Sequence, residues 1–343
     1  MKWASLVDKF KNCRVLVVGD ICLDRWCHYD PRESEPSRET RIPRLGIVST
    51  ETTPGAGGTV ANNLASLGAG HVAVLGAIGQ DGFGFELERI LAARNVDYRL
   101  LVASPRIQTF TYSKLINVST GKEDRPRFDF INNKPLPSEV EDQLIANFHK
   151  AYEGFDVIVA ADQAETEHGG VISDSFREVI ADVAERNPDK IVIADSRARI
   201  ERFRNTIAKA NREEAAAASK KLFGKIDYRA LRSAIGKHPM IVTEGSRGAW
   251  LVEEHSKKRI PAVPIKQLVD HCGAGDSFAA GLALALRVSG DLEMAARFGT
   301  LVSSITIQKR GTGTATAAEV LEKARFLENG RSEDELAASS AVS

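Results

Sequence analysis

Short apolar runs alternate with amphipathic stretches along most of the chain. The runs are brief, rich in β-branched residues and bounded by turn residues, which predicts buried strands at residues 15–18, 72–75, 157–160, 191–194 and 240–242. Between them, apolar positions recur with a helical period, as at Val60, Leu64 and Leu67. Strands that alternate with helices predict an α/β fold, in which helices cover both faces of a mostly parallel sheet.

Two segments interrupt this rhythm. Residues 25–50 are dense in charge and hold no helical period, whereas residues 104–133 alternate polar with apolar side chains, as at Tyr112, Lys114 and Ile116. Such alternation is typical of half-buried antiparallel strands, so we predict a small β-sheet that projects from the main one. We expect it to act both as a lid over a binding site and as a dimerisation surface.

The overall composition narrows the class of protein. The chain has 343 residues, 43% of them hydrophobic, and equal numbers of basic and acidic side chains, 46 of each. This balance gives no reason to expect nucleic acid or an anionic membrane as a partner. We interpret residues 1–330 as a single domain with lid segments at about 25–50 and 104–133, and residues 331–343 as a flexible tail.

Cysteine spacing and hydropathy point to the cytoplasm. The four cysteines do not have the spacing of a zinc site, so we expect free thiols. The first nine residues carry charges where a signal peptide needs an apolar stretch, and no apolar run reaches the ~18–20 residues of a membrane span. We therefore expect a cytoplasmic protein whose ligands are small molecules.

The most informative motif spans residues 270–278, Asp-His-Cys-Gly-Ala-Gly-Asp-Ser-Phe, and leads into a small, apolar helical pattern. A glycine turn at the start of a helix presents free N–H groups to an anion. Because the carboxylate of Asp276 would repel a phosphate held there permanently, it favours a general base beside an anion hole. The alternative is an ordinary turn with an acidic residue in the first turn of a helix.

Carboxylates and glycines also follow the first predicted strand. Asp20 and Asp24 would lie at the rim of the crevice beyond the carboxyl ends of the strands, where carboxylates suit ligands rich in hydroxyl groups. Gly57 and Gly58 precede the helix that holds Asn62 and would allow a ligand to approach the backbone. Turn and capping roles for the carboxylates, and a plain tight turn for the glycines, are the alternatives.

Two later segments suit a nucleotide and its metal ion. Asn211 and Glu214 stand three residues apart at a helix start and could share a hydrated divalent cation, but they also fit an ordinary helix cap. The turn with Thr243, Gly245 and Gly248 suits phosphate contact or a simple hairpin. The P-loop pattern is absent, and both Gly-x-Gly runs lack the last glycine of the dinucleotide fingerprint, which argues against a dehydrogenase.

The order of these motifs along residues 14–316 resembles the ribokinase-like carbohydrate kinases, the PfkB family. Residues 270–278 are similar to the family signature Asp-Thr-x-Gly-Ala-Gly-Asp-x-Phe, with His271 in place of the usual threonine. Residues 18–25, Val-Gly-Asp-x-x-Leu-Asp-Arg, look most like the heptose-phosphate kinases within it. The resemblance implies a three-layer α/β/α ribokinase-like fold with a small projecting β lid, and it implies the use of ATP and Mg²⁺.

The resemblance also implies a role for each matching position. Asp276 would be the catalytic base, and the amides of Gly273, Ala274 and Gly275 would form the anion hole. The remaining positions would contact ligands: sugar at Asp20, Asp24, Gly57, Gly58 and Asn62; Mg²⁺, through water, at Asn211 and Glu214; ATP at Thr243, Gly245 and Gly248; and a monovalent cation such as K⁺ at Asp270.

Our hypothesis from the sequence is an ATP-dependent kinase that phosphorylates a hydroxyl of a sugar or sugar phosphate, with a heptose-phosphate-like acceptor favoured and a homodimer formed through the lid sheet. A nucleoside kinase on the same fold and a catalytically silent sugar-binding regulator are the alternatives. The sequence does not identify the sugar. Arg32, Arg38, Arg41 and Arg44 could recognise a phosphate on the acceptor, or form a solvated charged surface. Thr59 stands where the family places a sugar-binding asparagine.

Overall fold

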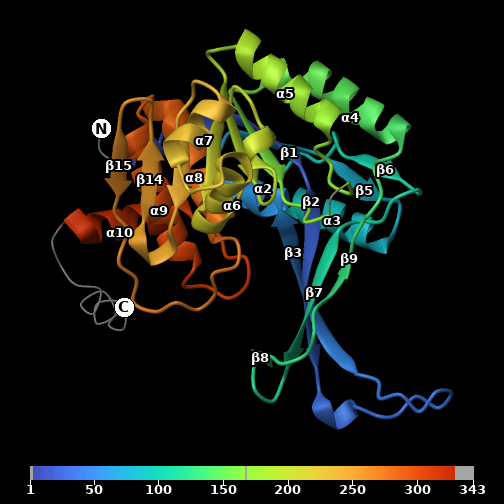
Figure 1. The fold of residues 1–343 in the computed structure, drawn as a ribbon. Coiled ribbons are helices and arrows are strands. Elements are labelled where there is room, and N and C mark those ends of the chain that lie inside the picture. The colour runs from blue at the N-terminus through green and yellow to red at the C-terminus, as the bar shows by residue number, and fades with distance from the viewer. Residues whose placement is uncertain (1–2, 167, 329–343) are drawn as a thin grey trace.

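The computed structural model describes residues 3–166 and 168–328, and its centre is an eight-stranded sheet (Figure 1). The strands from β4 to β13 are parallel, and β14 and β15 are added antiparallel at one edge. In spatial order they are β15 (Lys257–Ile260), β14 (Ala249–Val252), β13 (Met240–Thr243), β12 (Ile207–Asn211), β11 (Ile191–Ser196), β10 (Val157–Asp162), β1 (Arg14–Gly19) and β4 (His71–Leu75). The predicted strands are confirmed.

Helices cover both faces of this sheet, because successive side chains of a strand point to opposite sides. On β1, Val15 and Val17 pack in one buried cluster and Leu16 and Val18 in the other. The first cluster is formed with α1 (Trp3–Val7), α2 (Gly57–Ser66), α3 (Gly82–Ala93), α8 (Ala274–Ser289), α9 (Leu292–Thr306) and α10 (Ala317–Glu328). The second is formed with α4 (Ser138–Ala151), α5 (Asp174–Arg186), α6 (Arg212–Phe223) and α7 (Tyr228–Ile235). The three-layer α/β/α prediction is therefore confirmed.

A second sheet projects from this body as the lid (Figure 1). It contains β2 (Ile21–Tyr29), β3 (Ile47–Ala56), β7 (Thr111–Asn117), β8 (Lys122–Glu123) and β9 (Phe128–Phe130). β7 pairs antiparallel with β8 and β9, as predicted, but parallel with β2. The charge-dense segment is thus more ordered than its composition indicates, since it holds the outer halves of β2 and β3, joined by residues 30–46.

Short elements complete the chain. A two-stranded sheet consists of β5 (Ala77–Gly79) and β6 (Val102–Ser104), and the 3-10 helices are η1 (Phe10–Asn12), η2 (Pro31–Glu33), η3 (Tyr152–Gly154), η4 (Ile200–Arg202) and η5 (Gly245–Arg247). Within residues 3–166 and 168–328, no helix is both long and apolar enough to cross a bilayer. The predicted tail at 331–343 lies outside the described residues.

Candidate active site

The first turn of α8 presents free backbone donors. Gly273 caps the helix with φ 73°, a left-handed conformation that favours glycine. The N–H of Ala274 donates to the carbonyl of His271 at 3.2 Å, whereas those of Gly273, Gly275 and Asp276 have no acceptor within the described part of the chain. The free amides therefore differ from the predicted set, since Ala274 is engaged and Asp276 contributes its own N–H. Together they place three free donors at the positive end of the helix, an arrangement that can bind an anion.

The carboxyl group of Asp276, in the same turn, has a strongly raised pKa. Its side chain lies in the first helical turn, and burial raises the pKa of its carboxyl from 3.8 to about 7. The Asp195 carboxylate raises this pKa further, while the cations of Lys209 and Arg197 oppose the rise. A carboxyl group with a pKa near neutrality can accept and release a proton near pH 7.

Asp276 opens into a cavity of about 100 Å³ between the body and the lid. Asp24 of β2 and Thr59 of α2 line the same space, and so does Cys272. The remaining walls come from Arg25, Trp26, Ala56, Tyr112, Lys114, Arg127, Gln163, Arg197, Gly273 and Thr312. The cavity thus combines two carboxylates with several hydrogen-bond donors, which is a lining suited to a polyhydroxylated molecule.

Asp24 reaches this cavity from the lid strand β2 rather than from the sheet rim. Burial raises the pKa of its carboxyl to about 6, against the attraction of Lys114, Arg127 and Arg197. Its position depends on Gly55 across the strand pair, because a Cβ on residue 55 would come within 2.4 Å of Asp24 Oδ1. The glycine therefore preserves the orientation of the carboxylate.

Three cations beside these carboxylates were not singled out from the sequence. Lys114 comes from β7, Arg127 precedes β9, and Arg197 follows β11. Arg127 is paired with Asp129 and Arg197 with Glu165, at nitrogen–oxygen distances of 2.8 and 2.7 Å. Their convergence depends on the docking of the lid onto the body, which no local sequence pattern records.

Asp20 takes a different place from the one predicted. It is buried outside the cavity, where its carboxylate accepts the N–H groups of Gln163, Ala164 and Val171 at 2.7–2.8 Å. Burial raises the pKa of Asp20 to about 6 in spite of these three bonds. Asp20 therefore holds the segment after β10 and, through it, positions Gln163 on the cavity wall.

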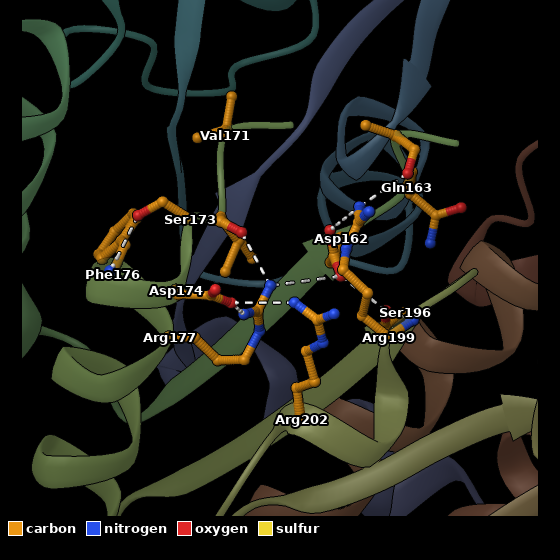
Figure 2. A network of polar contacts seen from close by, with 12 residues as sticks. Asp162, Gln163, Val171, Ser173, Asp174, Phe176, Arg177, Ser196, Arg199 and Arg202 are labelled. Atoms are coloured by element: carbon orange, nitrogen blue, oxygen red, sulfur yellow. Dashed lines mark hydrogen bonds and ion pairs between the residues drawn. The ribbon is translucent and has the colours of Figure 1, made fainter. Parts of the chain in front are cut away.

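Figure 2 shows how the same segment is fixed from its other side. Arg199 donates to both carboxylate oxygens of the buried Asp162, at 2.8 and 3.2 Å, and to the carbonyl of Ala164 at 2.7 Å. Arg177 and Arg202 converge from α5 and η4 and both pair with Asp174. This network is a rigid support on which the wall beside Arg197 rests.

The glycines of the predicted sugar loop are packed beneath the cavity. Gly57 and Gly58 are buried at the start of α2, and a Cβ on either would collide with its neighbours at 2.7–2.9 Å. Asn62 is also buried, and its Oδ1 accepts a hydrogen bond from Arg94 at 2.8 Å. From this helix it is Thr59 that lines the cavity, at the position where the family places a sugar-binding asparagine.

Asn211 and Glu214 form a capping box at the start of α6. Asn211 Oδ1 accepts the N–H groups of Glu213 and Glu214, and Glu214 Oε2 accepts that of Asn211 at 2.7 Å. The alternative reading of the sequence is therefore realised, although a cap leaves further lone pairs for water. Burial raises the pKa of Glu214, against the charge of Lys209.

A divalent cation fits this region only through water. Among the residues that the structure describes, no three His, Cys, Asp or Glu side chains converge as direct metal ligands. Asp195, Glu214 and Asp276 nevertheless surround Lys209, and all three carboxylates act on its pKa. This excess of negative charge suits Mg²⁺, which keeps most of its waters and takes few protein oxygens.

Thr243, Gly245 and Gly248 lie in the turn of the β13–β14 hairpin, and none of them lines the cavity at Asp276. Both glycines have positive φ, 57° and 83°, and a Cβ on Gly248 would meet the Ile260 carbonyl at 2.1 Å. The hairpin alternative is therefore the one that the structure shows. Because Thr243 pairs in register with Asn211, the turn lies beside Asn211 at the carboxyl ends of β12 and β13.

Asp270 fixes the loop before α8. Its Oδ1 accepts the N–H of Cys272 at 2.9 Å and its Oδ2 that of Gly311 at 3.1 Å. It lines a second cavity of about 600 Å³, which shares Trp26, Lys114 and Thr312 with the first. The monovalent cation predicted at Asp270 stays a prediction, since both of its oxygens already accept amides here.

The four arginines proposed to recognise a phosphate, Arg32, Arg38, Arg41 and Arg44, lie away from both cavities. Arg32 is 83% exposed and pairs with Asp30, and Arg44 is 59% exposed and pairs with Glu35. Arg38 and Arg41 are exposed too. In this arrangement the segment presents a solvated charged surface, and the cations near the carboxylates come from Lys114, Arg127 and Arg197 instead.

Comparison with known proteins places most of the chain in one family. Residues 14–319 match the family described as pfkB family carbohydrate kinase. Relatives named bifunctional protein HldE are 28% identical over 326 residues in Trichlorobacter lovleyi and 30% identical over 330 residues in Caulobacter vibrioides. Each alignment covers 92% of this chain but 64% of the relative, so the chain spans less than two thirds of their length.

Solved structures show the same fold. The ribokinase of Thermotoga maritima superposes with a TM-score of 0.69 at 22% identity, covering 91% of this chain and 99% of that one. An Arabidopsis thaliana ribokinase complexed with ribose and ATP gives a TM-score of 0.68 at 18% identity, over 92% and 99% of the two chains. These likenesses establish a ribokinase fold.

Proposed function

The chain belongs to the pfkB family of carbohydrate kinases, which are phosphotransferases with a hydroxyl acceptor, and we propose that it transfers the γ-phosphoryl group of ATP to a sugar phosphate through Asp276 as general base. One observation carries this proposal. A carboxyl with a pKa of about 7 lies in the first turn of α8, beside free N–H groups of that turn and inside a cavity that also holds Asp24.

The proposed reaction uses the cavity as follows. The acceptor hydroxyl donates a hydrogen bond to Asp276, which takes its proton as the new oxygen–phosphorus bond forms. The bond between the γ-phosphorus and the β–γ bridging oxygen breaks, and its electron pair leaves with ADP. The N–H groups of Gly273 and Gly275 face the negative charge that develops on the transferred group.

A metal ion and the lid complete the proposed site. Mg²⁺ would be held through water near Glu214 and Asn211, where it supplies positive charge to the phosphate oxygens. Docking of β2 and β7 over the cavity limits the access of water, which would otherwise compete with the sugar hydroxyl for the phosphoryl group. Thr243, Gly245 and Gly248 remain the proposed contacts to ATP.

The charges beside the acceptor carboxylates support an acceptor that already carries phosphate. Lys114 lines both cavities, and its ion-pair partner, Glu123, lies 3.8 Å from its Nζ. Arg25 also faces the first cavity, where its guanidinium group stacks over Phe83. An anionic substituent on the sugar would neutralise these cations, as the resemblance to heptose-phosphate kinases also implies.

The outer edge of the lid supports the proposed homodimer. β3 is an edge strand of its sheet, and Ile47 and Val48 are 44% and 56% exposed there. An exposed apolar edge strand tends to pair with another chain. A second copy of this chain is therefore the partner that we propose for the lid sheet.

A coupled assay of ADP release tests the function across free sugars, sugar phosphates and nucleosides. We expect turnover with phosphorylated sugars and a loss of about 10²–10⁴-fold in Asp276→Asn with ATP affinity preserved. Asp182→Asn, an exposed position on α5, is the control. Near-normal turnover in Asp276→Asn would remove the base assignment, activity on nucleosides alone would favour that class, and sugar binding without any turnover would favour a regulator.

A further inference from the structure

A buried lysine lies next to the proposed transfer site. Lys209 is on β12, and its side chain is 4% exposed. Its Nζ donates to Asp195 Oδ2 at 2.6 Å, and Asp195, on the neighbouring strand β11, is as deeply buried. Ionised lysines are rarely buried to this degree, because removal from water costs several kcal/mol per ion.

The ammonium group of Lys209 lies directly beside Gly275. A Cβ built on Gly275 would lie 2.7 Å from Lys209 Nζ and 3.8 Å from its Cε. The ammonium therefore occupies the space that a side chain at position 275 would need. Because side chains in a helix point toward its N-terminus, this space adjoins the free N–H groups of the first turn of α8.

Lys209 lies near more negative charge than its hydrogen-bonded partner Asp195 supplies by itself. Burial alone would lower the pKa of Lys209, but the carboxylates of Asp195, Glu214 and Asp276 outweigh it and raise that pKa. Lys209 thus stays protonated among three acids. An ammonium group has three N–H donors, and among the described residues Asp195 is the one hydrogen-bond acceptor of the Lys209 ammonium.

We propose that Lys209 belongs to the phosphoryl-transfer machinery, as a cation beside Gly275 that balances the negative charge gathered at the N-terminus of α8 when the γ-phosphate approaches Asp276. The inference rests on the proposed function. Asp195 acts as the positioning residue, since it orients the ammonium group toward Gly275. Gly275 thereby has two roles, as an amide donor and as the gap that admits this cation.

The same arrangement gives Lys209 and Asp195 opposite effects on Asp276. The charged groups that act on Asp276 are Asp195 and Lys209 from the sheet, Arg197 from the segment after β11, and Asp24 from the lid. Lys209 lowers the pKa of Asp276 and Asp195 raises it. A lysine that served only as a structural counter-ion of Asp195 would change stability and the pH dependence, but its removal together with Asp195 would leave the plateau value of kcat unchanged.

The test compares four variants under saturating ATP and Mg²⁺. In Lys209→Met the acid limb of the kcat profile should move to higher pH, and in Asp195→Asn to lower pH. The double variant removes both charges of the buried pair, so it keeps the fold even where Lys209→Met alone does not. We expect the kcat of the double variant to fall about 10²-fold, the loss typical of one oxyanion donor, while its acceptor KM stays within about threefold of the wild-type value. Lys209→Arg, which keeps a cation, should retain part of the wild-type kcat.

An exposed lysine provides the control for the loss of a positive charge. Lys258→Met removes an exposed lysine that pairs with Glu293, and its kcat should match the wild type. A folded double variant with kcat within about threefold of wild type would overturn the role of Lys209. If Asp276→Asn itself retained turnover, the proposed base would fail instead, and the two failures are separable because each uses its own variant.

Discussion

Replacement of Asp276 by asparagine should stabilise the protein, and the gain should grow with pH. The folded state raises the pKa of this carboxyl from 3.8 to about 7, mainly by burial. The protonated form is therefore favoured in the native state. Its contribution to stability is fully present below pH 3.8 and is lost as the pH rises through about 7. Asparagine has no proton to lose, so the variant escapes this loss.

The expected magnitude follows from the size of the shift. About three pKa units correspond to about 4 kcal/mol at ~1.4 kcal/mol per unit. Asp276 is partly exposed, so solvent screening reduces this figure, and the loss of a negative charge in the first turn of α8 removes about 0.5 kcal/mol more. We expect a net gain of about 1–2 kcal/mol at pH 8 and close to none at pH 4.

Urea unfolding of the ligand-free protein at pH 4 and pH 8 measures this difference directly. Asp182→Asn, on the exposed face of α5, serves as the matched control and should give the same free energy of unfolding as the wild type at pH 8. The reasoning is refuted if Asp276→Asn is less stable than the wild type at pH 8, or if its advantage is the same at both pH values.

Three further substitutions probe separate parts of the site. In Gly55→Ala the new Cβ would crowd Asp24 Oδ1 at 2.4 Å, so the acceptor KM should rise about tenfold or more while the ATP KM holds; equal acceptor KM values in steady-state assays would contradict this. Asn211→Ala should lower the free energy of unfolding by about 1 kcal/mol through loss of the capping box, and it should raise the Mg²⁺ concentration that gives half the maximal rate. An unchanged Mg²⁺ requirement would mean that Asn211 only caps the helix. Arg199→Met should cost about 3–5 kcal/mol in urea unfolding, because the buried Asp162 loses its bidentate partner and keeps only Arg177, 4.0 Å away, and the Ser196 hydroxyl. Adding Asp162→Asn should restore most of this loss, and no recovery would argue against the charge as the cause.

Five strands of the main sheet could be predicted because each is a short, apolar run bounded by turn residues. The lid was harder, since β2 carries charge along an otherwise buried strand. On β2, Leu23 and Cys27 are buried, whereas Asp24 and Trp26 are half-buried. This pattern can be recognised in the sequence only if residues 21–29 are already taken as one continuous strand. The tertiary pairing of β2 with β7 then decides which side of that strand faces the cavity.

The two rim carboxylates illustrate why motif spacing alone could not place the site. Asp20 and Asp24 are four residues apart, yet Asp20 lies in the short break between β1 and β2, after Gly19 with φ 131°, and turns toward the segment after β10. Asp24 continues into the lid and meets Asp276 across the cavity. The difference depends on backbone direction after Gly19, which the residue types do not specify.

Lys209 shows the opposite case, a signal present in the sequence that the motifs did not use. The strand Ile-Ala-Lys-Ala holds a single lysine among apolar residues. A lysine in such a strand can be buried only if an acidic partner is buried beside it. In register with it stands Asp195, also at the end of an apolar strand. The pair costs stability when the site is empty, and so does the raised pKa of Asp276. Both costs fall when positive and negative charges of a bound nucleotide and metal ion enter the same space. A site that is strained when empty and relieved when filled is what preorganised electrostatic catalysis requires, so ligand binding should stabilise this protein more than contact area alone would suggest.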